Sequence, residues 1–228
     1  MLRRPAAVTQ GTGYRRPVPD HDADRAAGHY FEAQPSSERA PRMVELVTID
    51  GAIRLETDRG VFSHDAVDVG TQLLLAEGPP VRDGGLIVDL GCGYGPIATT
   101  LARRAPDARI WATDTNARAR ELCERNAERL GLTNVEVHPA DEAPDTGVDE
   151  IWSNPPIRIG KAALRSLLTV WLERLNPEGR AVLVVQKHLG ADSLAAWLTE
   201  QGWPTTRLAS RRGFRILEVS ARAAARTD

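Results

Sequence analysis

Residues 89–97, DLGCGYGPI, place three glycines between an apolar run and a helical pattern. The run before them, GLIVDL at 85–90, is typical of a buried β-strand, and PIATTLARRA at 96–105 has the spacing of a helix. Gly91, Gly93 and Gly95 lack side chains, so the backbone can turn tightly there and approach a ligand. We therefore predict a strand, a glycine loop and a helix that together border a binding site.

Strand and helix patterns alternate through the rest of the chain. Further strands are predicted at 109–114, 134–140, 150–154, 180–186, 205–210 and 215–220, and further helices at 117–131, 162–175 and 192–202. Such alternation is typical of an α/β fold with helices on both faces of a mostly parallel sheet. We predict a Rossmann-like, seven-stranded sheet whose last two strands, joined by a few residues, are antiparallel.

The segments before this alternation have a different character. Residues 1–41 are rich in Arg, Pro, Asp and Gly without apolar periodicity, which predicts a flexible arm, either a solvated tail or a basic arm that touches RNA. Two β-prone runs flank Asp50 and Gly51, which predicts a β-hairpin over 42–61. The main domain is then expected over 62–228.

Composition narrows the possible partners. The chain has 228 residues and a formal net charge of -2, so nucleic acid would have to be held by a local patch. Cys92 and Cys123 are not in a metal-binding spacing, and no metal is expected. No apolar run is long enough to span a membrane, and the arginine-rich start lacks the apolar core of a secretory signal. These features indicate a cytoplasmic protein.

Acidic residues follow three of the predicted strands. In such sheets ligands bind beyond the carboxyl ends of the strands. Asp89 can accept from a ligand's ammonium group or from the loop's own amides, Asp114 is placed to take ribose hydroxyls, and Asp141 is near the position of an adenine amino group. Pro96 stands where a dinucleotide-binding loop would have its third glycine, which argues against NAD or FAD.

With these residues the chain resembles a class I S-adenosylmethionine-dependent methyltransferase. The resemblance implies S-adenosylmethionine as cofactor, with the ribose on Asp114 and the adenine near Ala140 and Asp141. It places the following residues around the methionine part or nearby: Asp89, Gly91, Gly93, Gly95, Asn116 and Asn154.

A turn of unusual chemistry, Asn154-Pro155-Pro156, follows the predicted strand at 150–154. The prolines remove two backbone donors, so we expect local carbonyls without answering amides. The Asn154 side-chain oxygen and the Pro155 carbonyl can then both accept from an exocyclic NH2 group and aim its nitrogen lone pair at a methyl donor. The alternative is a turn without catalytic role.

A closer resemblance covers residues 61 to about 220. The stretches VFSHDAVDVGTQLLL, DLGCGYGPI, SNPPIRIGK and RRGFRIL together resemble the methyltransferase small-domain family. Its best-known members modify guanine N2 of small-subunit ribosomal RNA. The resemblance implies that Phe62 and Ser63, with Gly70 and Thr71, fold over the cofactor, although Phe62 alone is equally consistent with a core residue.

The substrate side departs from the family pattern. Ile157 stands where the family has an aromatic residue that stacks on the base, which leaves Pro156 and Ile157 as an apolar clamp. Arg158, Lys161 and Arg215 are expected to contact substrate phosphates, or alternatively to form a solvated basic face.

The sequence thus predicts methyl transfer from S-adenosylmethionine to an exocyclic amino nitrogen, with guanine N2 of ribosomal RNA as the preferred target. Two alternatives stay open. One is methylation of a protein glutamine or a small-molecule amine, and the other is a non-catalytic RNA-binding or assembly factor on a methyltransferase scaffold. The oligomeric state is not predicted.

Overall fold

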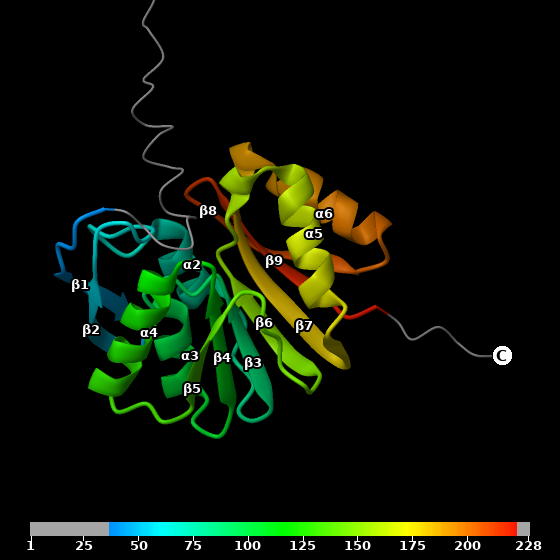
Figure 1. The fold of residues 1–228 in the computed structure, drawn as a ribbon. Helices are drawn as coiled ribbons and strands as arrows, with labels where there is room; N and C mark the ends of the chain where they lie inside the picture. The colour runs from blue at the N-terminus through cyan, green and yellow to red at the C-terminus, as the bar shows by residue number, and fades with distance from the viewer. Residues whose placement is uncertain (1–36, 223–228) are drawn as a thin grey trace, which may run out of the picture.

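The computed structural model describes residues 37–222, and its centre is one seven-stranded sheet (Figure 1). The strand order is β5-β4-β3-β6-β7-β9-β8. All neighbouring pairs from β5 to β7 are parallel, whereas β9 runs antiparallel to both β7 and β8. The bounds are β3 Leu86–Leu90, β4 Arg109–Asp114, β5 Val135–Pro139, β6 Val148–Ser153, β7 Leu175–Gln186, β8 Thr205–Arg211 and β9 Phe214–Ser220. The predicted Rossmann-like sheet is confirmed.

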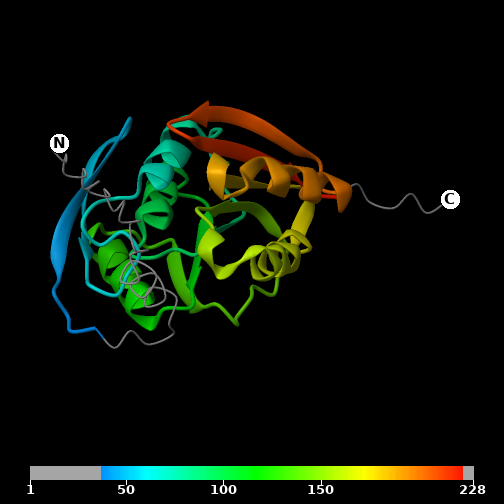
Figure 2. The same cartoon turned by 90° about the horizontal axis from the view of Figure 1, so that it is seen from above.

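Helices lie on both faces of this sheet. The helices are α2 Val69–Glu77, α3 Pro96–Arg104, α4 Ala117–Arg129, α5 Lys161–Leu172 and α6 Ala191–Glu200, with short 3-10 turns η1 Ile157–Ile159 and η2 Lys187–Leu189. Side chains of α2, α3 and α4 share one apolar cluster with Ile87 and Ile110 of the sheet. Side chains of α5 and α6 share a second with Val88 and Leu183, which point to the opposite face. Figure 2 shows the two helix layers on either side of the strands.

The predicted hairpin is confirmed, and it is part of the core. β1 (Arg42–Thr48) pairs with β2 (Gly51–Thr57), and Gly51 at the turn has φ 109°. Alternate residues of the two strands are buried in the cluster of α2, α3 and α4; they are Val44, Leu46, Ile53 and Leu55. The buried Asn126 carboxamide of α4 pairs with the backbone N–H and C=O of Glu56 and also donates to the Tyr94 carbonyl. One side chain therefore ties the hairpin to the glycine loop.

The predicted arm at 1–41 lies mostly outside the described residues. Its last part, from Ser37, is bound to α4: Arg39 pairs with Glu121, and Arg118 donates to the Ser37 carbonyl at 2.9 Å. The Ala40 amide donates to Asp58 at 2.5 Å. In residues 37–222, no helix is long and apolar enough to cross a membrane.

Two helix predictions differ from the structure. The helix predicted to run to Leu175 ends at Leu172, because Leu175 pairs with Val148 in the sheet and already belongs to β7. Helix α2 was not predicted. It begins after Asp68, whose side chain caps it by accepting from the Thr71 amide at 3.1 Å.

The alternation of strands and helices predicted helices over both faces of the sheet. One part of the sheet, however, has no helix over it. Residues 140–147, which connect β5 to β6, form turns and contain no helix. On β4, the Trp111 ring is instead covered by the His138 ring of β5, with centroids 3.4 Å apart and planes 3° apart. The Arg109 guanidinium lies 5.5 Å from the same Trp111 ring. Side chains of the sheet itself thus shield this part from water.

Candidate active site

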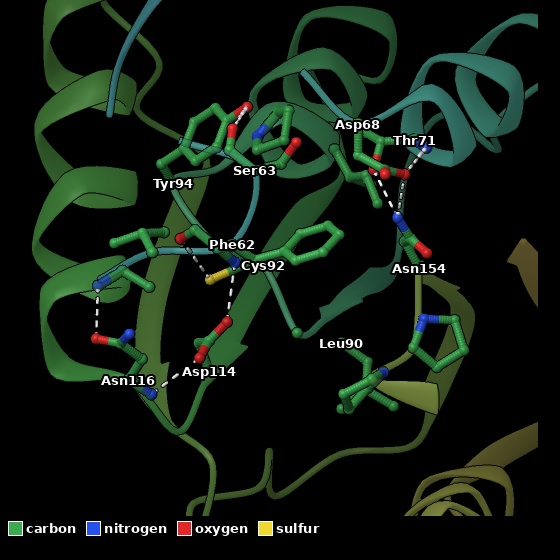
Figure 3. Close-up of a pocket in the computed structure, with 18 of the residues that line it drawn as sticks. Phe62, Ser63, Asp68, Thr71, Leu90, Cys92, Tyr94, Asp114, Asn116 and Asn154 are labelled. Atoms are coloured by element: carbon green, nitrogen blue, oxygen red, sulfur yellow. Dashed lines mark hydrogen bonds between the residues drawn. The ribbon is translucent and has the colours of Figure 1, made fainter. Parts of the chain in front are cut away.

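A cavity of about 570 Å³ opens at the carboxyl ends of the parallel strands, where the sequence had predicted a site. It is bordered by the loops that follow β3, β4, β5 and β6, by the segment before α2 and by the start of β9. Figure 3 shows Asp114 and Asn116 on one side of it, Asp68, Thr71 and Asn154 on the other, and Phe62 between them. The predicted residues that line it are Phe62, Ser63, Gly91, Gly93, Asp114, Asn116, Ala140, Asn154, Pro155, Pro156, Ile157 and Arg158.

The glycine loop is locked to the neighbouring strand. The amides of Gly91 and Cys92 donate to the Thr113 carbonyl at 2.9 and 3.0 Å, and the Gly93 amide donates to Asp114 Oδ2 at 2.9 Å. Gly91 and Gly93 have φ values of 80° and 56°, with open space where a Cβ atom would be. These amides are already satisfied and do not point free donors at a phosphate, which agrees with the argument against a dinucleotide. The loop offers close approach for a ligand instead.

Gly95 has another role than the predicted one. It does not line the cavity, and a Cβ atom there would lie 2.8 Å from the Sγ atom of Cys123. Its φ is 90°, a backbone conformation that glycine adopts without strain. Gly95 therefore allows the close packing of α3 against α4, and it lies outside the cavity lining.

Asp89 lies behind the cavity wall and not in its lining. The side chain is fully buried, and its Oδ2 atom accepts from the Ala98 amide of α3 at 2.8 Å. Burial raises the pKa of this carboxyl to about 8, and the neighbouring Asp114 charge adds to the rise, while the Ala98 N–H opposes it. Among residues 37–222 the Oδ1 atom has no hydrogen-bond partner. This amide belongs to α3, so the prediction that Asp89 accepts from the glycine loop's own amides is wrong.

Asp114 and Asn116 shape the far side of the cavity. Asp114 accepts from the amides of Gly93 and Asn116, and desolvation raises its pKa against these hydrogen bonds. Asn116 caps α4 through its side-chain oxygen, and its Nδ2 donates to the Gly60 carbonyl at 2.7 Å. Asn116 thus holds the chain before Phe62 against α4 while lining the cavity.

The cover of the cavity comes from the segment before α2, as the family resemblance implied. Phe62 is 46% exposed and lines the cavity, so the alternative of a core residue is wrong. The buried Tyr94 hydroxyl lies 3.5 Å from the Ser63 carbonyl and connects this segment to the glycine loop. Asp141, predicted near the adenine, is exposed and outside the lining, whereas Ala140 borders the cavity.

Asn154 is fixed in one orientation. Its Nδ2 atom donates to Asp68 Oδ2 at 2.8 Å and to Thr71 Oγ1 at 3.1 Å (Figure 3). Because a carboxylate only accepts, this contact requires the amide nitrogen to face Asp68 and directs the oxygen elsewhere. Among the described residues the Oδ1 atom has no hydrogen-bond partner, and it is not among their buried unpaired atoms. The site thus contains an open, oriented acceptor.

The Pro155 carbonyl is less free than predicted. It accepts from the Ile157 amide at 2.8 Å, and the Pro156 carbonyl accepts from the Ile159 amide at 3.1 Å. The prolines remove their own donors, but the turn η1 brings later amides back to their carbonyls. The expectation of carbonyls without answering amides is therefore wrong, although a carbonyl oxygen has a second lone pair to offer.

Of the three basic residues predicted to contact the substrate, one lines the cavity and two do not. Arg158 lines the cavity, whereas Lys161 is an exposed residue at the start of α5 outside the lining. Arg215 lies outside the lining too, with its guanidinium 3.5 Å from the Asp192 carboxylate of α6. Successive strand residues point to opposite faces, so Arg215 faces α6 while its neighbour Phe214 faces the cavity. Sequence reasoning missed Phe214, and strand alternation alone did not identify which of the two faced the cavity.

Asp68 was also missed. It lines the cavity and caps α2, and the only sequence signal was its position as a polar residue before an apolar helical run. Thr71, which was expected in the covering segment, turns out to hold Asn154.

Comparison with known proteins identifies the family of this chain. The sequence model of the methyltransferase small domain matches residues 52–218. The chain belongs to the methyltransferase small-domain family. The matched range includes the glycine loop, Asp114 and the Asn154 turn described above.

The relatives that match this chain differ in length: one is about as long as the matched region, and others are about twice as long. The chain is 34% identical over 197 residues to the uncharacterized protein YbxB of Bacillus subtilis, an alignment that covers 84% of this chain and 97% of YbxB. It is 34% identical over 159 residues to ribosomal RNA small subunit methyltransferase C of Shewanella sp. (strain MR-4), covering 67% of this chain and 46% of that protein. The chain thus spans about half the length of the ribosomal RNA methyltransferases that it matches.

A solved structure shows the same fold. The T. thermophilus 16S rRNA N2 methyltransferase RsmC, described in complex with AdoMet and guanosine, superimposes with a TM-score of 0.68 at 23% identity. The match covers 82% of this chain and 52% of that one. This methyltransferase small-domain protein thus shares the fold of a methyltransferase that is described with AdoMet. Its cavity fits S-adenosylmethionine, since Gly91 and Gly93 leave open space at its lining and the Asp114 carboxylate borders it.

Proposed function

We propose that this protein transfers a methyl group from S-adenosylmethionine to an exocyclic amino nitrogen, and that its target is guanine N2 in ribosomal RNA. The observation that carries the proposal is Asn154. Its amide nitrogen is held by Asp68 and Thr71, and its oxygen stays open at the cavity. The relatives that are named ribosomal RNA small subunit methyltransferase C support the choice of RNA.

The chemistry requires acceptors because an exocyclic amine shares its lone pair with the ring. S-adenosylmethionine, when bound, supplies a sulfonium methyl group; the new N–C bond forms as the C–S bond breaks, and the nitrogen then loses a proton to water. Asn154 Oδ1 and the remaining lone pair of the Pro155 carbonyl hold the NH2 group, so that its lone pair can turn out of the ring plane. Positive charge develops on the nitrogen beside these two dipoles, which lowers the barrier.

The mouth of the cavity suits a base that has been extruded from its stack. Phe62 and Ile157 border it with apolar surface, and Arg158 provides a positive charge at the same lining. Phe62 is half-exposed, and its aromatic ring can stack on a base. It lies in the segment before α2, whereas the family pattern has its aromatic residue at the position of Ile157, after β6. A paired guanine has to be flipped out to reach Asn154.

Replacing Asn154 by alanine tests the proposal. We expect Asn154→Ala to lower kcat by at least about 100-fold, the usual effect of removing one positioned polar group at a reacting centre, with little change in S-adenosylmethionine affinity. Turnover is measured by transfer of labelled methyl groups to ribosomal RNA, and cofactor affinity by calorimetry. Asp141→Ala is a matched control on another loop of the same sheet edge, and should leave turnover nearly unchanged. Full turnover in Asn154→Ala would refute the role of this residue.

The same assay separates the alternative substrates. Ribosomal RNA, ribosomal protein and a metabolite extract are offered in parallel, because the acceptor at Asn154 would also hold a glutamine amide or a small amine. Label that appears only in protein or only in the metabolite extract would refute the RNA proposal. A folded protein that binds S-adenosylmethionine but transfers no label to any of the three would favour a non-catalytic RNA-binding factor.

A further inference from the structure

Asp68 has one carboxylate oxygen that the protein uses and one that it leaves open. Oδ2 accepts from the Thr71 amide at 3.1 Å and from Asn154 Nδ2 at 2.8 Å. For Oδ1, no partner occurs among residues 37–222, and it is not one of their buried unpaired atoms. Asp68 is half-buried and lines the cavity directly beside Asn154. The acceptor that orients Asn154 therefore belongs to a carboxylate that also borders the cavity.

A carboxylate at this place distinguishes the bases by the atom next to their amino group. In guanine, the ring nitrogen N1 beside the 2-amino group carries a hydrogen and is a donor. In adenine and cytosine, the ring nitrogen beside the amino group is an acceptor. An ionised carboxylate has no hydrogen to donate, so it accepts from guanine N1–H and repels the lone pair of the other two.

The other carboxylate near the mouth is already engaged. Asp65 also lines the cavity, but its Oδ1 atom accepts from Arg42 at 2.6 Å. His64 lies 3.4 Å from the same Asp65 carboxylate. Asp68 is thus the carboxylate in direct hydrogen-bond contact with the proposed amine-binding residue.

We propose that Asp68 is the residue that selects guanine: one oxygen holds the Asn154 carboxamide, and the other accepts N1–H of the target base. The inference rests on the proposed function, because it places the 2-amino group at Asn154. It adds a specificity-determining residue that acts on the base itself.

The substitution Asp68→Asn tests the proposed contact with the base most directly. Asparagine keeps one oxygen for the Thr71 amide and Asn154 Nδ2, and it remains a good helix cap. Its NH2 group then occupies the open position and turns an acceptor into a donor. The probes are guanosine and 2,6-diaminopurine riboside, which share the 2-amino group but carry N1 as a donor and as an acceptor, respectively. Binding is measured by calorimetry or NMR titration with saturating S-adenosylhomocysteine, so that the nucleoside cannot enter the cofactor position.

We expect the wild-type protein to bind guanosine at least about tenfold more tightly than 2,6-diaminopurine riboside, in line with a single base-edge contact. Asp68→Asn should lose this preference or reverse it, with the affinity for S-adenosylhomocysteine unchanged. Asp65→Asn, the same substitution at the neighbouring cavity carboxylate, should keep the wild-type ratio. A general loss of structure would weaken both nucleosides and the cofactor together, and would not reverse the ratio.

An unchanged ratio in Asp68→Asn, or no preference in the wild-type protein, would overturn the inference while leaving methyl transfer at Asn154 in place. Conversely, guanosine selectivity that depends on Asp68, in a protein that transfers no methyl group to RNA, would refute the proposed reaction and support the base-reading role.

Discussion

Asp89 is a carboxyl group held wholly inside the protein, with one amide as its hydrogen-bond partner. Its pKa of about 8 lies above that of a carboxyl in the unfolded chain, which is near 4. Between these two values the folded protein binds a proton that the unfolded chain has released. Stability from this group is therefore present at low pH and is lost as the pH rises toward 8.

Asp89→Asn should remove this pH dependence. The asparagine keeps an acceptor for the Ala98 amide and has no proton to lose. We expect the variant to gain stability relative to the wild type by about 1.4 kcal/mol per pH unit between roughly pH 4 and 8, as an upper bound from linkage. Urea unfolding at pH 5, 6, 7 and 8 measures the difference. Asp141→Asn, at an exposed position, serves as the control, and a constant offset at all four values would contradict the expectation.

Individual site residues were predictable where chemistry and chain position coincided. Asn154 and Asp114 were identified because both end a strand at the ligand edge of the sheet, beside a glycine loop. Asp68 was not, because its chemical role depends on a contact with Asn154, which is 86 positions away. Arg215 was misplaced because a strand has two faces and nothing near it in the sequence marks which face meets the cavity.

At the scale of elements, the packing of α3 against α4 is set by Gly95. The glycine begins α3 at a φ of 90°, and the place of its missing Cβ atom is bordered by the Cys123 Sγ atom at 2.8 Å and Cα atom at 3.3 Å. Any larger residue has to push the two helices apart. Because α3 follows the glycine loop directly, such a shift is transmitted to the cavity.

Gly95→Ala is expected to lower the free energy of unfolding by about 3 kcal/mol, from backbone strain and overpacking together. Gly84→Ala is the matched control: its φ is 107° but nothing lies within 4 Å of its Cβ position, so only about 1 kcal/mol of strain is expected. Urea unfolding measures both. Adding Cys123→Ala to Gly95→Ala should recover part of the loss, and the absence of any recovery would show that the sulfur contact is not the cause.

At the scale of the whole molecule, a cluster of charged side chains with the buried Glu150 at its centre connects three strands of the sheet. Glu150 on β6 is fully buried and accepts from Arg180 of β7 at 2.6 Å and from the Trp152 Nε1 atom at 2.8 Å. Arg180 also lies 3.2 Å from Glu218 of β9. Three neighbouring strands, β6, β7 and β9, are thereby joined through one guanidinium.

Arg180→Leu should cost about 3 kcal/mol of stability, because it leaves the Glu150 charge buried without its main partner. Arg82, 3.6 Å from Glu150, keeps the expected loss at the lower end for such a change. The double variant with Glu150→Gln should be more stable than Arg180→Leu alone, since the neutral amide still accepts from Trp152. Arg207→Leu, which removes an exposed pair with Asp192, should cost less than about 1 kcal/mol in the same denaturation assay.

The architecture as a whole was largely predictable, because long apolar runs and glycine signals repeat along the chain. The failures came from tertiary pairing. Leu175 fits the leucine stripe of a helix, yet it pairs with Val148 in the sheet. The general expectation of helices over both faces of the sheet did not include the stacking of Trp111 on His138, which depends on the pairing of β4 with β5.

The hydrogen bond from Asn154 to Asp68 closes a loop of 86 positions and joins the turn after β6 to the residue that caps α2. Contacts of such long sequence separation carry a large loop-closure entropy and form late during folding. In a refolding experiment, the proposed methyl transfer should therefore return after the bulk of the secondary structure, and its time course would report the closure of this loop.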